Sequence, residues 1–113
     1  MSSRNQLIAA PPYEVERALK TLGQNLRTAR LRRNLTLAEM AERIGVGRHV
    51  VAAAERGKPS TGVAVYAAML WALGLGDELA RMADPLTDEE GLRLARGRER
   101  VNAYPRRALD NDF

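Results

Sequence analysis

Two short helical patterns separated by a glycine-containing turn most constrain how this chain folds. Thr36 and Glu39 form a capping box, in which the threonine hydroxyl and the glutamate carboxylate each satisfy a free amide at a helix start. This spacing predicts a helix over residues 37–44, which Gly45 ends in a left-handed conformation. A second short helix is predicted over residues 48–56, after a turn of about three residues. Two helices joined by so short a turn must cross each other closely.

The side chains in this segment have the sizes that a crossing helix pair needs. Ala41 is small where the two helices would meet. The residues that would close a shared core are apolar: Met40, Ile44, Val46 and Val51. The residues left on the open face of the second helix are Arg48, His49, Ala52 and Ala53. Because the major groove of B-form DNA admits an α-helix, this 22-residue helix-turn-helix pattern makes the open face a candidate DNA-reading surface.

The rest of the chain also predicts helices. Alanine and leucine are abundant, and no stretch alternates apolar and polar residues as a half-buried strand does. Further helices are expected over residues 15–33, 61–73, 77–82 and 88–100. Ser60 or Thr61 is expected to cap the helix that follows, and Thr87 with Glu90 is expected to form a second capping box. The sequence therefore predicts an all-α protein.

The placement of charge favours nucleic acid as a partner. Residues 1–58 carry 11 basic and 5 acidic side chains, whereas residues 59–113 carry 7 and 9. Sixteen of the 18 cations are arginine, whose planar fork pairs with phosphates and with guanine edges. Arg27, Arg32 and Arg33 either flank DNA or form a solvated helix face, and the sequence favours neither alternative.

Composition argues against several classes of enzyme and membrane protein. There is no cysteine and only one histidine, which leaves no thiolate site and no multi-histidine metal site, so neither a metal nor a cofactor is expected. Glu39 and Glu42 stand one helical turn apart, yet no serine-histidine-acid set or glycine-rich phosphate cradle accompanies them, so the chain is not expected to be an enzyme. No apolar run is long enough to span a bilayer, and no secretion signal is evident, so a cytoplasmic location is expected.

Residues 36–57, followed by Lys58-Pro59, resemble the Xre family of bacterial and phage regulators, and the resemblance covers Leu22 to about Met82. It implies a five-helix, λ-repressor-like bundle, here with an extra C-terminal helix and a flexible tail. Three parts are expected: a flexible N-terminal arm at 1–12, a DNA-binding domain at 13–83, and a helix and tail at 84–113 for dimer or toxin contact.

Residues 66–75 and 83–91 are similar to the HipB branch of these regulators, antitoxins that pair with a HipA-type kinase toxin. This second resemblance implies a homodimer that binds operator DNA, represses its own operon and sequesters the toxin. A stand-alone regulator without a toxin and a module that mainly binds protein remain alternatives.

The resemblance also implies roles for individual residues. Base contacts fall on Gly47, Arg48, His49, Ala52 and Ala53, and phosphate contacts fall on Thr36, Arg56, Lys58 and the amides near Ser60. Arg30 and Glu55 are expected to form a structural ion pair behind the second helix. One departure is Leu37, because the family often has a phosphate-binding glutamine there.

The dimer face is left open by the sequence. Trp71, Leu75 and Leu79, with Met82, are expected either to form that face or to close the core of one subunit. The tail residues Tyr104, Pro105, Arg106 and Arg107 are a further candidate contact with a toxin or a dimer mate.

Overall fold

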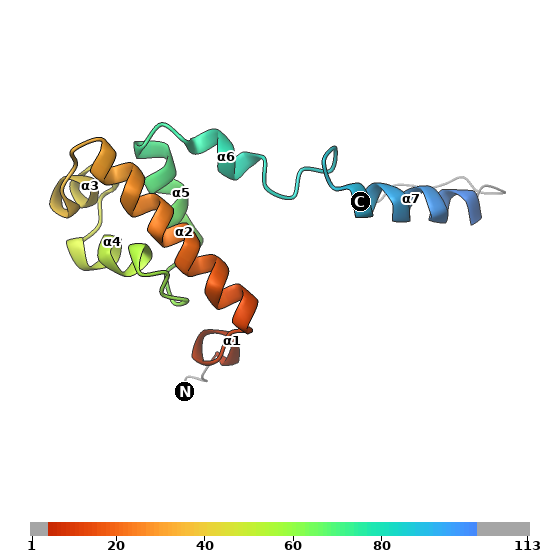
Figure 1. The fold of residues 1–113 in the computed structure, drawn as a ribbon, viewed down its shortest axis with the longest axis horizontal. Coiled ribbons are helices and arrows are strands. Elements are labelled where there is room, and N and C mark those ends of the chain that lie inside the picture. The colour runs from red at the N-terminus through yellow and green to blue at the C-terminus, as the bar shows by residue number, and fades with distance from the viewer. Residues whose placement is uncertain (1–4, 102–113) are drawn as a thin grey trace. The chain divides into compact units, whose positions relative to one another are not determined.

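The computed structural model describes residues 5–101 of the 113-residue chain, and all regular structure in that range is helical (Figure 1). The helices are α1 (Gln6–Ala9), α2 (Tyr13–Arg32), α3 (Leu37–Ile44), α4 (Arg48–Glu55), α5 (Val63–Ala72), α6 (Gly76–Ala80) and α7 (Glu89–Val101). The expected all-α class is confirmed. The chain divides into two units, one up to Leu79 and one from Ala80.

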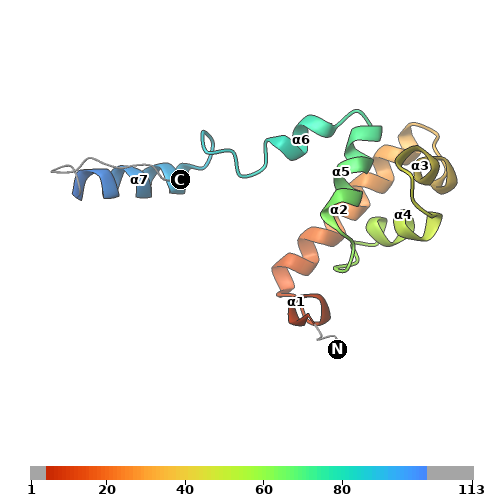
Figure 2. The ribbon, with the colours of Figure 1, turned by 180° about the vertical axis from the view of Figure 1, so that it is seen from behind.

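The core of the first unit lies between α2, α3, α4 and α5, and Figures 1 and 2 show the last three grouped around α2. Its fully buried large side chains come one each from these four helices: Leu26, Met40, Val51 and Met69. Burying a side chain of this size contributes about 1.5–3 kcal/mol relative to leaving it in water. Packing in this core therefore stabilises three helices that would be too short to persist alone.

Local capping explains where α3 begins and ends. The Thr36 hydroxyl accepts a hydrogen bond from the Glu39 amide at 3.0 Å, and the Glu39 carboxylate accepts one from the Thr36 amide at 2.9 Å. Gly45 then adopts a φ of +78°, in the left-handed region that favours glycine. The predicted capping box and the predicted glycine stop are both present.

The cap predicted for α5 is wrong. The residue before this helix is Gly62, which offers no side chain, and neither Ser60 nor Thr61 caps it. Instead, the Thr61 amide donates to the Lys58 carbonyl at 3.0 Å, which closes a turn ahead of the helix. Both hydroxyl residues therefore stand in a loop.

The second predicted capping box is also replaced by a different arrangement. The Asp88 carboxylate accepts from the Gly91 amide at 3.0 Å at the start of α7, while the Thr87 hydroxyl donates to the Asp84 carbonyl at 3.2 Å. Because the turn at Asp84 occupies the Thr87 hydroxyl, the neighbouring aspartate takes over the cap. A helix cap formed by this aspartate also gives the acidic side chain a structural role.

Differences at the ends are small. The short helix α1, capped by Asn5, lies within the segment expected to be a flexible arm. The fifth helix expected from the sequence, α6, ends at Ala80 instead of Met82. The tail residues proposed for toxin or dimer contact lie outside the described residues.

Candidate nucleic-acid interface

The turn between α3 and α4 sets the direction in which α4 leaves the bundle. The amides of Gly45 and Val46 both donate to the Ala41 carbonyl, at 2.9 and 3.0 Å, so α3 ends tightly. Gly47 is extended and precedes α4 without a side-chain cap. The buried residues of α4 are Val51, Ala54 and Glu55. With these residues turned inward, the opposite side of α4 faces outward.

The outward side of α4 carries the residues that the sequence assigned to base contacts. Arg48 and His49 are exposed, and Ala52 and Ala53 are half-buried. The His49 imidazole lies over Gly47, where an added Cβ would stand 2.8 Å from Nδ1. A glycine at this position therefore leaves room for the ring beside the start of α4. The structure brings the predicted base-contacting residues together on one surface.

The residues predicted to contact phosphates are all exposed: Thr36, Arg56, Lys58 and Ser60. Arg56 follows directly after α4 and lies on the same side as Arg48 and Ala52, since four residues make about one helical turn. Ser60 stands in the turn before α5 and not at its first amides. Leu37 is half-buried and packs against the core, so it offers no polar group to a ligand.

A buried ion pair holds α4 from behind. The Glu55 carboxylate accepts from Arg30 Nε at 2.6 Å and from Nη2 at 2.9 Å, and Arg30 Nη1 donates to the Leu35 carbonyl at 2.7 Å. The hydrogen bonds to Glu55 raise the pKa of Arg30 above its ordinary value and outweigh the opposing effect of burial. Arg30 is therefore charged at every working pH and ties α2, α4 and the loop before α3 together.

Two glycines that the sequence analysis did not single out for packing let α4 lie directly against α2. A Cβ on Gly23 would stand 2.5 Å from the Glu55 carbonyl oxygen, and one on Gly57 would stand 2.6 Å from the Leu19 carbonyl oxygen. Gly57 also has a φ of +73°. The sequence did contain a signal for Gly23, because a glycine inside a helical pattern costs about 1 kcal/mol relative to alanine and usually has a packing reason. Sequence alone could not name the helix that Gly23 contacts.

A comparison with protein-family models finds a match to the family described as a helix-turn-helix domain. The match covers residues 21–82, which is more than half of the chain. The chain belongs to the helix-turn-helix domain family. This assignment supports a DNA-binding regulator of the Xre-like type, and such domains are typically non-enzymatic. Searches of the curated proteins and of the solved structures find no match to the chain.

The four residues expected at a dimer face differ in exposure. Leu75 and Leu79 are half-buried and pack against the core of their own subunit. Trp71 on α5 is 68% exposed, and Met82 is 65% exposed. Of the four, Trp71 and Met82 present most of their surface to solvent.

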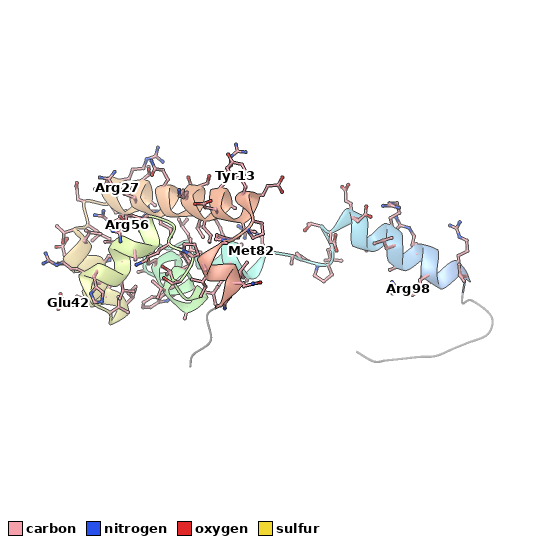
Figure 3. All side chains as sticks on the ribbon, turned by 90° about the horizontal axis from the view of Figure 1, so that it is seen from below. Tyr13, Arg27, Glu42, Arg56, Met82 and Arg98 are labelled. Carbon is pink, nitrogen blue, oxygen red and sulfur yellow. The ribbon has the colours of Figure 1, made fainter. Side chains whose placement is uncertain are left out.

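The two carboxylates that stand one helical turn apart on α3, Glu39 and Glu42, have a structural and a solvated position. Glu39 is occupied by its capping box, and Glu42 lies exposed on α3 (Figure 3).

None of the helices between residues 5 and 101 has both the length and the apolarity that a membrane crossing needs.

Proposed function

We propose that the protein is a sequence-specific transcriptional repressor that binds operator DNA as a homodimer, with α4 in the major groove. The observation that carries this proposal is that α4 buries one side and presents Arg48, His49, Ala52 and Ala53 on the other. In B-form DNA, an arginine fork on the O6 and N7 atoms of guanine discriminates by about 1–3 kcal/mol. Arg48 is the residue proposed for such a contact.

The other residues on α4 would contribute less to base recognition. His49 donates to a base or a phosphate, the two alanine methyls contact thymine methyls, and the backbone at Gly47 approaches closely. Direct readout therefore depends on few hydrogen bonds. We propose that four exposed residues contact backbone phosphates and set the register of α4 on the duplex: Thr36, Arg56, Lys58 and Ser60.

The test is binding of the full chain to a duplex from the region upstream of its own gene. The affinity should fall steeply as salt is raised, because phosphate contacts release counterions. Arg48→Ala should relax the preference at one base pair in each half-site, whereas Arg17→Ala, an exposed arginine on α2, should leave that preference unchanged. If Arg48→Ala lowers affinity equally for all sequences, Arg48 contacts phosphate and not bases. No binding even at low salt would refute the proposed function.

Dimer formation is proposed to involve the exposed side of α5. This helix contains no charged residue between Val63 and Ala72, and Val63 and Trp71 are 70% and 68% exposed. A two-fold pair would place half-sites about 10 base pairs apart, or at a multiple of that spacing. Trp71→Glu should then give a monomer by light scattering, while the free wild-type protein has the mass of a dimer. A wild-type monomer at working concentration would refute this dimer.

The resemblance of residues 66–75 and 83–91 to HipB-like regulators extends the proposal to an antitoxin that represses its own operon and holds a HipA-type kinase toxin. This extension predicts a kinase-like reading frame next to the gene. The product of that frame should co-purify with this protein, and co-expression should relieve its toxicity. Operator binding without such a neighbour would instead favour a stand-alone regulator.

A further inference from the structure

A groove between α2 and α4 extends the basic surface beyond the helix-turn-helix pair. Its walls include Lys20, Gln24 and Arg27 from α2 and Ala52 and Arg56 from α4 and its end. Leu37, the first residue of α3, also lines it. In Figure 3, Arg27 is labelled on α2 and Arg56 on the neighbouring α4. The groove therefore lies where the three helices meet, beside the proposed DNA-reading face.

The charge of this groove is strongly positive. Its single carboxylate, Glu55, accepts two hydrogen bonds from Arg30, so that negative charge is already compensated. Among residues 5–101, neither Arg27 nor Arg56 forms an ion pair. Lys20 pairs with Glu16 at 3.5 Å, but both side chains are largely exposed, so the pairing is weak. At least two arginine forks are thus available to an anion.

The groove is continuous with the outer side of α4. Ala52 lines it and also stands between Arg48 and Arg56, one helical turn from each. A phosphate-bearing ligand that contacts Arg56 on the outer side of α4 therefore enters a groove that Arg27 also lines. Leu37 cannot supply a polar contact there, whereas Gln24 brings an amide donor and Arg27 a charged fork.

We propose that this groove binds backbone phosphates of duplex DNA, with Arg27 as the main contact and Lys20 as a second cation on α2. This inference rests on the proposed function, because α4 must lie in the major groove for the backbone to reach α2. It assigns Arg27 to the DNA interface and leaves Arg17, an exposed residue of α2 that does not line the groove, in solvent.

The experiment measures the slope of log affinity against log salt for the full chain on its upstream duplex. The variants are Arg27→Gln, Lys20→Gln and, as a matched control on the same helix, Arg17→Gln. Because the proposed dimer carries two copies of each substitution, loss of one phosphate contact per subunit should reduce the slope by about 1.8. Between 50 and 200 mM salt, wild type should then lose about 12-fold more affinity than Arg27→Gln. Lys20→Gln should give a smaller change, and Arg17→Gln should match wild type.

Two further comparisons keep the inference distinct from the proposed function. On a duplex of unrelated sequence, Arg27→Gln should cause the same change in slope, because phosphates carry no sequence information. If wild type binds the operator but Arg27→Gln and Arg17→Gln give equal slopes, the groove is not a phosphate site while the proposed function stands. If wild type binds no duplex at low salt, both fail. Far-ultraviolet circular dichroism confirms that each variant is folded.

Discussion

Removal of the Glu55 carboxylate should severely destabilise the first unit. Arg30 and Glu55 are paired through two hydrogen bonds, and their side chains are only 6% and 5% exposed, so water screens them little. In Glu55→Ala, Arg30 keeps its hydrogen bond to the Leu35 carbonyl but loses its counter-charge. Leaving one charge of a buried pair uncompensated costs about 3–5 kcal/mol.

This loss is large compared with the stability of a small domain. At about 0.05–0.15 kcal/mol per residue, a unit of this size unfolds with a free energy of about 4–11 kcal/mol. Glu55→Ala should therefore lose about a quarter of the unfolding free energy or more. In Arg30→Met with Glu55→Leu, both charges are gone, and most of the stability should return because the desolvation cost disappears as well. The return should be incomplete, since the Leu35 carbonyl loses its donor at 2.7 Å, which costs about 1–3 kcal/mol.

The assay is urea unfolding followed by circular dichroism, with Glu42→Ala as a control for loss of an exposed carboxylate. Because the pKa of Arg30 is raised, its contribution is fully present below its ordinary pKa and is lost only as pH rises through the raised value. The cost of Glu55→Ala should thus be the same at neutral and at mildly alkaline pH. The reasoning is refuted if Glu55→Ala costs no more than Glu42→Ala.

Three other substitutions test the packing and the caps. Gly23→Ala should lower the free energy of urea unfolding by about 1–3 kcal/mol, because the new methyl group would meet the Glu55 carbonyl. Gly97→Ala in α7 has open space around it and should raise helicity. Equal effects of the two substitutions would contradict the close approach at Gly23. Tyr66→Phe should leave the melting temperature unchanged or raise it, because the Tyr66 hydroxyl is buried and has no hydrogen-bond partner among the described residues; a clear fall would show that it has one. Thr36→Ala should cost about 0.5–2 kcal/mol by removing the cap of α3, and an unchanged urea midpoint would be evidence against that cap.

Local patterns in the sequence predicted the part of the fold that carries the interface. The capping box at Thr36 and the stop at Gly45 depend only on residues a few positions apart, and the structure has both. The apolar spacing of α2 was equally clear, because it repeats over five turns of one helix. Since the residues proposed to contact bases lie within α4 and its cap, the prediction of α4 also placed these residues on one surface.

Features that depend on distant segments could not be predicted in the same way. Gly23 is needed because a carbonyl of α4 lies 2.5 Å from where its Cβ would be, and nothing near Gly23 in sequence encodes that carbonyl. Arg27 and Arg56 are separated by the whole of α3, yet they line one groove. Thr61 has a hydroxyl that could cap a helix, but its amide donates to the Lys58 carbonyl, which places Thr61 in the turn before α5. In each case, the packing of two elements decided the outcome.

The position of α4 and its proposed recognition of DNA depend on opposite sides of the same helix. The inner side of α4 is fixed by the Glu55 side chain and by the Glu55 carbonyl, which packs against Gly23. Arg48, Ala52 and Ala53 form the outer side. If α4 reads DNA as proposed, the few hydrogen-bonding groups on that outer side mean that affinity comes largely from phosphates, and specificity comes from the two recognition surfaces of the proposed dimer. Substitutions on the inner side should therefore change stability and DNA binding together, while those at Arg48 or Arg27 should change DNA binding alone.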